Sequence, residues 1–86
     1  MRTIVLTAQS RFIPEKITVP RNVKFLLIVR NESKSNDEFE SDDLGTEKAM
    51  KPGQSIELLL GPLRKGTYQF TGDMHRDTAK GQIIVE

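Results

Sequence analysis

Short β-prone segments separated by turn signals follow one another along the whole chain, and none carries the periodicity of an amphipathic helix. In these segments apolar residues tend to recur at every second position, which is the spacing of a half-buried strand. The expected strands are 3–7, 17–19, 23–29, 38–44, 55–60, 67–70 and 82–85. About seven short strands with turns at this spacing predict an all-β fold, either a β-sandwich or a small barrel. We expect a single domain covering residues 1–86.

Local sequence signals define the edges and the centre of the predicted fold. Residues 23–29 are apolar on both alternating faces, which indicates a central strand. The proline of segment 12–14 restricts it to an edge or a bulge, and Asn22 is expected to adopt a left-handed turn conformation. Residues 72–80 are too few and too polar for a helix, so we predict a loop between the last two strands. That loop holds His75, the only histidine, and loops on a rigid scaffold often carry function.

The composition excludes several classes of chemistry. With no cysteine, the chain has no disulfide, thiolate nucleophile, zinc–thiolate site or iron–sulfur cluster. A net charge of +1, with only four Phe and one Tyr as aromatic residues, disfavours nucleic-acid binding. No apolar run approaches the roughly 18 residues of a membrane span. We therefore expect no nucleic-acid partner and no direct membrane insertion.

Acidic residues gather in the middle of the chain. Residues 37–47 hold six of the twelve: Asp37, Glu38, Glu40, Asp42, Asp43 and Glu47. Such a segment repels itself unless a positive group lies near it. It is either a solvated acidic surface or a set of oxygen ligands for a cation, completed by His75. His75 itself has polar neighbours, which leaves a surface histidine, a ligand and a proton carrier as alternatives.

Several motifs, in their order along the chain, resemble a cupredoxin-like domain. They are residues 12–20 (FIPEKITVP), 27–32 (LIVRNE), 38–41 (EFES), 51–53 (KPG), 61–70 (GPLRKGTYQF) and 75–85 (HRDTAKGQIIV). The resemblance covers nearly the whole chain and implies a Greek-key β-sandwich. It places any metal site where the loop before Phe39 meets the last interstrand loop.

The electron-transfer copper site of such domains does not carry over. The resemblance places its histidine, cysteine, second histidine and methionine ligands at Asp37, Gly72, His75 and Ala79. Only His75 is retained. Since a blue-copper centre depends on a cysteine sulfur, we expect no blue-copper centre.

A branch poor in copper ligands is more similar, namely the small periplasmic partners of bacterial ferrous-iron permease systems. The matching motifs are Glu38-Phe39-Glu40-Ser41, Glu47-Lys48 and Asp73-Met74-His75-Arg76-Asp77-Thr78, with Met74 in place of an aromatic residue and Gly72 in place of an acidic one. The resemblance implies a periplasmic protein that binds an iron or copper ion and works with a membrane iron permease or a periplasmic iron-binding protein. The N-terminus lacks the basic-then-apolar pattern of a secretion signal, so we expect either a cytoplasmic chain or a mature form whose leader is replaced by a start methionine.

Five residues are candidate metal ligands. His75 is the nitrogen ligand, Glu38, Glu40 and Glu47 are oxygen ligands from the facing loop, and Asp73 is either a ligand or the acceptor that orients the imidazole. Alternation along an extended segment puts Glu38 and Glu40 on one side and Phe39 on the other, in the core. Carboxylates with one imidazole suit Fe(II) and bind Fe(III) more strongly, so such a site lowers the iron reduction potential. Cu(II) binds the same ligands more tightly than the other divalent ions do.

Three functional classes remain open. The first is a metal-handling protein that assists iron uptake by binding iron or helping to oxidise it. The second is a metal-free interaction module whose acidic loop docks on a basic partner surface, with His75 tuning the contact with pH. The third, a single-stranded nucleic-acid binder, is disfavoured by the charge and the few aromatic residues. The sequence shows no catalytic triad or phosphate-binding glycine loop, so it predicts no hydrolase or transferase activity.

Overall fold

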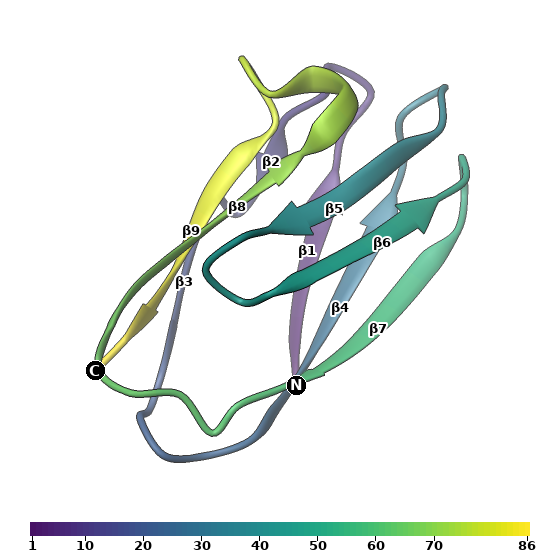
Figure 1. Cartoon of the computed structure of the whole chain (residues 1–86). Helices are drawn as coiled ribbons and strands as arrows, with labels where there is room; N and C mark the ends of the chain where they lie inside the picture. The colour runs from purple at the N-terminus through teal and green to yellow at the C-terminus, as the bar shows by residue number, and fades with distance from the viewer.

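All 86 residues are described by the computed structural model, in which nine strands form two facing sheets (Figure 1). The strands are β1 (Arg2–Leu6), β2 (Phe12–Ile13), β3 (Lys16–Val19), β4 (Phe25–Asn31), β5 (Asp37–Ser41), β6 (Thr46–Met50), β7 (Ser55–Leu60), β8 (Gly66–Gly72) and β9 (Lys80–Val85). One sheet has the order β2-β1-β4-β7 and the other β3-β9-β8-β5-β6. The predicted all-β sandwich is confirmed. No helix in it is long and apolar enough to cross a membrane.

The strand count exceeds the expected number because one predicted strand is half of a hairpin and one predicted edge is itself a strand. The predicted strand 38–44 ends at Ser41, turns through Gly45 (φ 64°) and returns as β6. Only Met50 of β6 is buried, so this edge strand lacks the alternation by which strands are recognised. β2 pairs with β1 alone, in keeping with the edge position that proline imposes on segment 12–14.

The core lies between the two sheets and contains 15 buried apolar residues. Three aromatic rings meet in it, Phe12 from β2, Phe39 from β5 and Phe70 from β8, with centroids 5.1 to 6.2 Å apart. Phe39 is fully buried, which confirms the predicted inward anchor of its strand. Because aromatic side chains bury large apolar areas, this contact determines which face of β5 points inward.

β4 confirms the predicted central strand, because it pairs with β1 on one side and with β7 on the other. Its inner face is fully buried at Leu27 and Val29. The strand begins later than expected, since the ladder with β7 starts only at Phe25. Val23 therefore lies outside the strand and is 50% exposed. Asn22 has a φ of 62°, the left-handed conformation that its turn position predicts.

The end of the sandwich opposite the two termini carries η1 (Asp73–His75), a 3₁₀ turn between β8 and β9, together with the β4–β5 loop (Figure 1). The expectation of a helix-free segment 72–80 is wrong by one turn, because three residues of 3₁₀ helix form without an apolar face. Buried Asn31 holds the neighbouring loop. Its Nδ2 donates to the carbonyls of Ser35 and Met50, and its Oδ1 accepts from the amide of Ser33. These bonds fix the path by which the chain enters β5.

Candidate functional site

Asp37, the first residue of β5, is a buried carboxylate that ties the strand to η1. Its side chain is 0% exposed and shares the inner face of the strand with Phe39. Oδ1 accepts hydrogen bonds from the backbone amides of Glu38 at 2.7 Å and Met74 at 3.0 Å, and Oδ2 lies 2.9 Å from His75 Nδ1. Because a carboxylate oxygen accepts, the imidazole is assigned as the donor through Nδ1. Asp37 therefore sets the orientation of the only histidine.

Gly72 and Ala79 close the space beside Asp37. Ala79 is 0% exposed, and its carbonyl accepts a hydrogen bond from the Gly72 amide at 2.8 Å. A Cβ added at Gly72 would lie 2.9 Å from Ala79 Cβ and 3.2 Å from Asp37 Oδ2. Interiors packed this closely have no spare volume for an extra methyl group. Residue 72 therefore accepts a side chain only if its neighbours move.

The residues at this end do not fit the blue-copper centre that the resemblance to cupredoxin-like domains implies at these positions. The four positions that the resemblance assigns to copper ligands do lie together, at Asp37, Gly72, His75 and Ala79. They supply no sulfur, Gly72 has no room for a cysteine side chain, and His75 Nδ1 is bonded to Asp37. A blue-copper centre requires that sulfur, so its donor set is missing and its space is filled.

The outer face of β5 carries a group of carboxylates that we call the glutamate cluster: Glu38, Glu40 and Glu47. Glu38 and Glu40 leave β5 on the side opposite Phe39, and Glu47 stands directly across the β5–β6 ladder from Glu40. One carboxylate oxygen from each lies within 4.8 Å of the other two. Glu38 and Glu40 are half-buried, whereas Glu47 is exposed. The predicted shared side of Glu38 and Glu40 is confirmed, and three oxygen atoms converge there.

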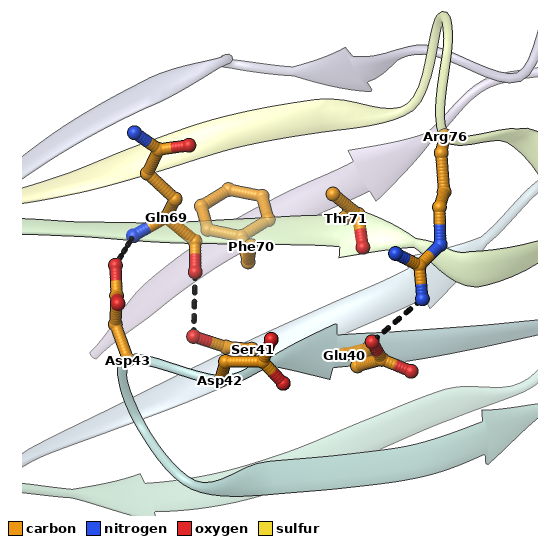
Figure 2. A pocket seen from close by; sticks show the side chains of 8 residues that line it. All are labelled: Glu40, Ser41, Asp42, Asp43, Gln69, Phe70, Thr71 and Arg76. Carbon is orange, nitrogen blue, oxygen red and sulfur yellow. Dashed lines mark hydrogen bonds and ion pairs between the residues drawn. The ribbon is translucent and has the colours of Figure 1, made fainter.

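Arg76 joins the glutamate cluster to η1. Its Nη2 donates to Glu40 Oε1 at 2.8 Å, and its Nε donates to Asp73 Oδ1 at 2.8 Å; the pair with Glu40 is drawn in Figure 2. The hydrogen bond and charge of Asp73, followed by the charge of Glu40, raise the pKa of Arg76. The pKa of Glu40, whose side chain is 17% exposed, is raised first by partial burial and then by the charge of Asp73. The attraction of Arg76 is thus outweighed at Glu40 by burial and by the surrounding negative charge.

A polar hollow of about 350 Å³ opens beside Arg76, between β5 and β8 (Figure 2). It is lined by Glu40, Ser41, Asp42, Asp43, Gln69, Phe70, Thr71 and Arg76. The β5–β8 ladder contains only two residue pairs. Beyond them, side chains from the end of β5 and from the turn after it form hydrogen bonds with the backbone of β8. Ser41 Oγ donates to the Gln69 carbonyl, and the Gln69 amide donates to Asp43 Oδ2. The acidic lining suits a cation or a basic side chain better than an apolar ligand.

The five predicted ligands divide between the two faces of β5. The structure brings three together on the outer face: Glu38, Glu40 and Glu47. Asp73 adjoins this group through Arg76, whereas His75 is bonded to Asp37 on the inner face. The acceptor that orients the imidazole is Asp37 rather than Asp73. Strand alternation is the physical reason, because neighbours in an extended segment point in opposite directions.

The predicted site residues omit Asp37 and Arg76, which organise this geometry. A signal for Asp37 is present in the sequence, since it lies two residues before Phe39 and so shares its inward face. Arg76 lies three residues after Asp73, a spacing that permits an ion pair within one helical turn. Its second contact, with Glu40, depends on the pairing of β8 with β5, which places η1 beside β5. No local sequence pattern predicts this long-range pairing.

Comparison with known proteins relates the sequence to a family. The family described as "Cupredoxin-like domain" matches residues 1–85. An uncharacterised protein of Rickettsia prowazekii is 45% identical over 75 residues, which make up 87% of this chain and 60% of that protein. The chain therefore spans only about three fifths of the length of this relative.

Solved structures share the fold at low sequence identity. A purple cupredoxin from Nitrosopumilus maritimus is 13% identical, with a TM-score of 0.76 and 100% of both chains covered. The metal-binding domain of the Cu(I)-exporting P-type ATPase CopA of Streptococcus pneumoniae is 17% identical, with a TM-score of 0.84 over 98% of this chain and 82% of that one. Auracyanin A, a blue copper protein of Chloroflexus aurantiacus, is 12% identical, with a TM-score of 0.82 over 100% and 98% of the two chains. Together with the family match over nearly every residue, the shared sandwich shows that this chain belongs to the cupredoxin-like domain family.

Proposed function

We propose that the protein binds an iron-type divalent cation at the glutamate cluster and serves iron uptake in the periplasm, by binding the ion or by helping to oxidise it. The observation that carries this proposal is the convergence of three carboxylates on one face, with an oxygen of each within 4.8 Å of the others. The raised pKa of Glu40 points the same way, because a bound cation relieves the repulsion that contributes to it.

The chemistry of the glutamate cluster favours hard ions. Carboxylate oxygens suit Fe(II) and Mn(II) and gain more from the higher charge of Fe(III). A site of this kind lowers the iron reduction potential, so it eases transfer of an electron from the bound ion to an external acceptor. Cu(II) stands higher in the divalent affinity series. Selection of iron then depends on metal supply and site geometry rather than on affinity.

Arg76 and Asp73 form the boundary of the proposed site. While Arg76 is bonded to both Glu40 and Asp73, it acts as an internal counter-charge for the glutamate cluster. An entering cation competes with this guanidinium. When Arg76 is displaced, the Asp73 carboxylate becomes available as a fourth oxygen ligand. His75 is not needed in this set, since its Nδ1 is bonded to Asp37 on the other face of the strand.

The assignment to iron uptake draws on family likeness rather than on the cluster itself. The motif 38–41 and the loop around His75 resemble periplasmic partners of ferrous-iron permeases. That resemblance supports a periplasmic location and an interaction with a membrane permease or a periplasmic iron-binding protein. Structural relatives described as copper proteins support metal handling as the general role.

Metal titration tests the proposal. We expect wild-type protein to bind Mn(II), and Fe(II) under anaerobic conditions, with a Kd on the order of micromolar by calorimetry. Replacing Glu38 or Glu47 by Gln should weaken binding by at least about tenfold. Glu57→Gln is the matched control, because it removes the same charge from an exposed position on β7 of the opposite sheet. Equal affinities in all four proteins would contradict a site at the glutamate cluster.

A second candidate function is metal-free docking of a basic partner on the same acidic surface. The bond between Arg76 and Glu40 favours it, because it shows that the glutamate cluster already accepts a guanidinium. Such docking would weaken steeply with salt and would ignore chelators. If the titration detects no metal binding while a synthetic arginine-rich peptide binds and is displaced by salt, the docking function replaces the metal-binding one.

A further inference from the structure

We infer that Asp37 performs, on the inner face of β5, the structural task that a bound ion performs in a metal site, so that this face is closed to metal and held together by the chain itself. This inference does not depend on the outer glutamate cluster. It concerns the opposite face of the same strand and stands whether or not Glu38, Glu40 and Glu47 bind a cation.

The buried carboxylate of Asp37 accepts hydrogen bonds from two segments of the chain, which is the first support for the inference. Asp37 collects one donor from its own strand, the Glu38 amide, and two from η1, the Met74 amide and the His75 imidazole. A carboxylate without solvent is costly unless its oxygens are paired. Here both oxygens are used, and no buried side-chain nitrogen or oxygen is left without a partner. One anion therefore crosslinks two segments that are 37 residues apart in the chain.

The second support is the lack of space for an ion. Gly72 and Ala79 approach so closely that an added Cβ at Gly72 would meet Ala79 Cβ at 2.9 Å and the two Asp37 oxygens at 3.2 and 3.3 Å. The hollow of Figure 2 includes none of these residues. A metal ion here needs ligand distances near 2.0–2.2 Å from nitrogen or oxygen, so it must displace the Asp37 carboxylate before it can bind His75 Nδ1.

The contact with Asp37 determines the chemistry of His75 Nδ1. Because the imidazole donates from Nδ1 to a carboxylate, that nitrogen carries a proton and offers no lone pair to a metal. Removing the carboxylate frees Nδ1, and replacing it by an imidazole puts a second nitrogen ligand in the same place. Asp37 is thus the residue that decides whether Nδ1 of His75 is used in a contact within the chain or is open to a metal.

Zn(II) is the probe that tests this assignment, with the His75 ring resonances as the NMR readout. The titrations use the Glu47→Gln background, which weakens the binding of an ion at the outer glutamate cluster. With Asp37 present, we expect the His75 ring signals to stay in place at one equivalent of Zn(II). In the Asp37→His variant they should move in stoichiometric proportion to Zn(II). His75 signals that move with Asp37 present, or that stay fixed in a folded Asp37→His variant, would overturn the inference.

Asp37→Asn supplies a test that does not require metal or a large change of shape. Its side-chain oxygen still accepts from the Glu38 and Met74 amides, but the charge-assisted contact with His75 is lost. We expect hydrogen exchange of the Met74 amide to accelerate about fivefold, since charged and neutral hydrogen bonds differ by about 1 kcal/mol. The exposed Asp42→Asn is the matched control. An unchanged exchange rate at Met74 in Asp37→Asn would show that the carboxylate is not the tie and would overturn the inference.

Discussion

The two faces of β5 treat negative charge in opposite ways. On the inner face, one carboxylate is fully buried, and each of its oxygens accepts a hydrogen bond. On the outer face, three carboxylates crowd together, and the Arg76 guanidinium pairs with only one of them, Glu40. The inner carboxylate therefore stabilises the fold, whereas the outer ones repel one another and attract cations. Two residues adjacent in sequence, Asp37 and Glu38, have different roles because an extended chain points them in opposite directions.

This contrast also separates the protein from its copper-binding relatives. The resemblance assigns the copper ligands of such domains to the inner end, where this chain has Asp37, Gly72 and Ala79 in contact. The fold is kept, but its inner site is closed by side chains. On the proposed function, a cation is bound on the outer face, where carboxylate oxygens converge.

The largest effect should come from breaking the inner face with Asp37→Ala. This substitution leaves the Met74 amide and the His75 imidazole without their buried acceptor. We expect a loss of about 3–5 kcal/mol in the free energy of unfolding, as for other broken buried pairs, measured by urea denaturation. Asp42→Ala, at an exposed position of the same segment, should change it by no more than about 0.5 kcal/mol. Equal losses in the two variants would remove the distinction between the faces.

The next effect concerns the contact between Gly72 and Ala79. Gly72→Ala places a methyl group against Ala79 and Asp37, and overpacking of this kind costs about 1–3 kcal/mol. Ala79→Gly on its own should also destabilise the protein, because it removes a buried methyl group. In the double variant the new methyl group takes the place of the lost one. A double-mutant cycle should therefore show strong favourable coupling, and additive losses would mean that the inner end is not tightly closed.

Arg76→Gln sharpens the contrast on the outer face. Without the guanidinium, Glu40 and Asp73 lose their internal counter-charge. A bound divalent ion then meets less competition, and its affinity should rise about fivefold, corresponding to about 1 kcal/mol for one charge in a solvated setting. The free energy of unfolding should fall by no more than about 1 kcal/mol, as for other surface ion pairs. Calorimetry with Mn(II) checks the first expectation, and weaker Mn(II) binding by the variant would contradict it.

The smallest effect is the pH dependence contributed by Glu40. Its pKa in the folded protein lies above the ordinary value of 4.5, so folding favours the protonated carboxyl. The resulting stabilisation is fully present below pH 4.5 and is lost as the pH rises through the raised pKa. Because Glu40→Gln stays neutral, its stability relative to wild type should be higher at pH 7 than at pH 4. Urea denaturation at both pH values checks this sign.

Most of the fold follows from patterns that are local in the sequence. The sequence predicts three of these features directly: Phe39 lies in an alternating segment, Leu27 in a segment that is apolar on both faces, and Asn22 at a turn position. β6 escapes prediction because only Met50 of that strand is buried. An edge strand that is largely open to solvent carries little alternation to read.

The candidate site is less predictable than the fold. Alternation predicts that Glu38 and Glu40 share a side, and Glu47 reaches them through the β5–β6 register. The position of His75 depends on a contact with Asp37 across 38 residues of chain. The sequence identifies such long-range partners by residue type alone. It therefore predicts a contact between the imidazole and the acidic segment, but not which carboxylate makes it. The structure instead pairs it with the one inward-facing carboxylate of that segment.

One NMR measurement tests the central claim, which is that the outer face of β5 binds cations and the inner face does not. Zn(II), a diamagnetic substitute for Fe(II), is added to wild-type protein labelled with ¹³C and ¹⁵N. At one equivalent we predict that the carboxyl carbon signals of Glu38, Glu40 and Glu47 shift, while the ring signals of His75 remain in place. A shift of the His75 ring with no change at the three glutamates would contradict the account and would return the metal site to the inner end of the sandwich.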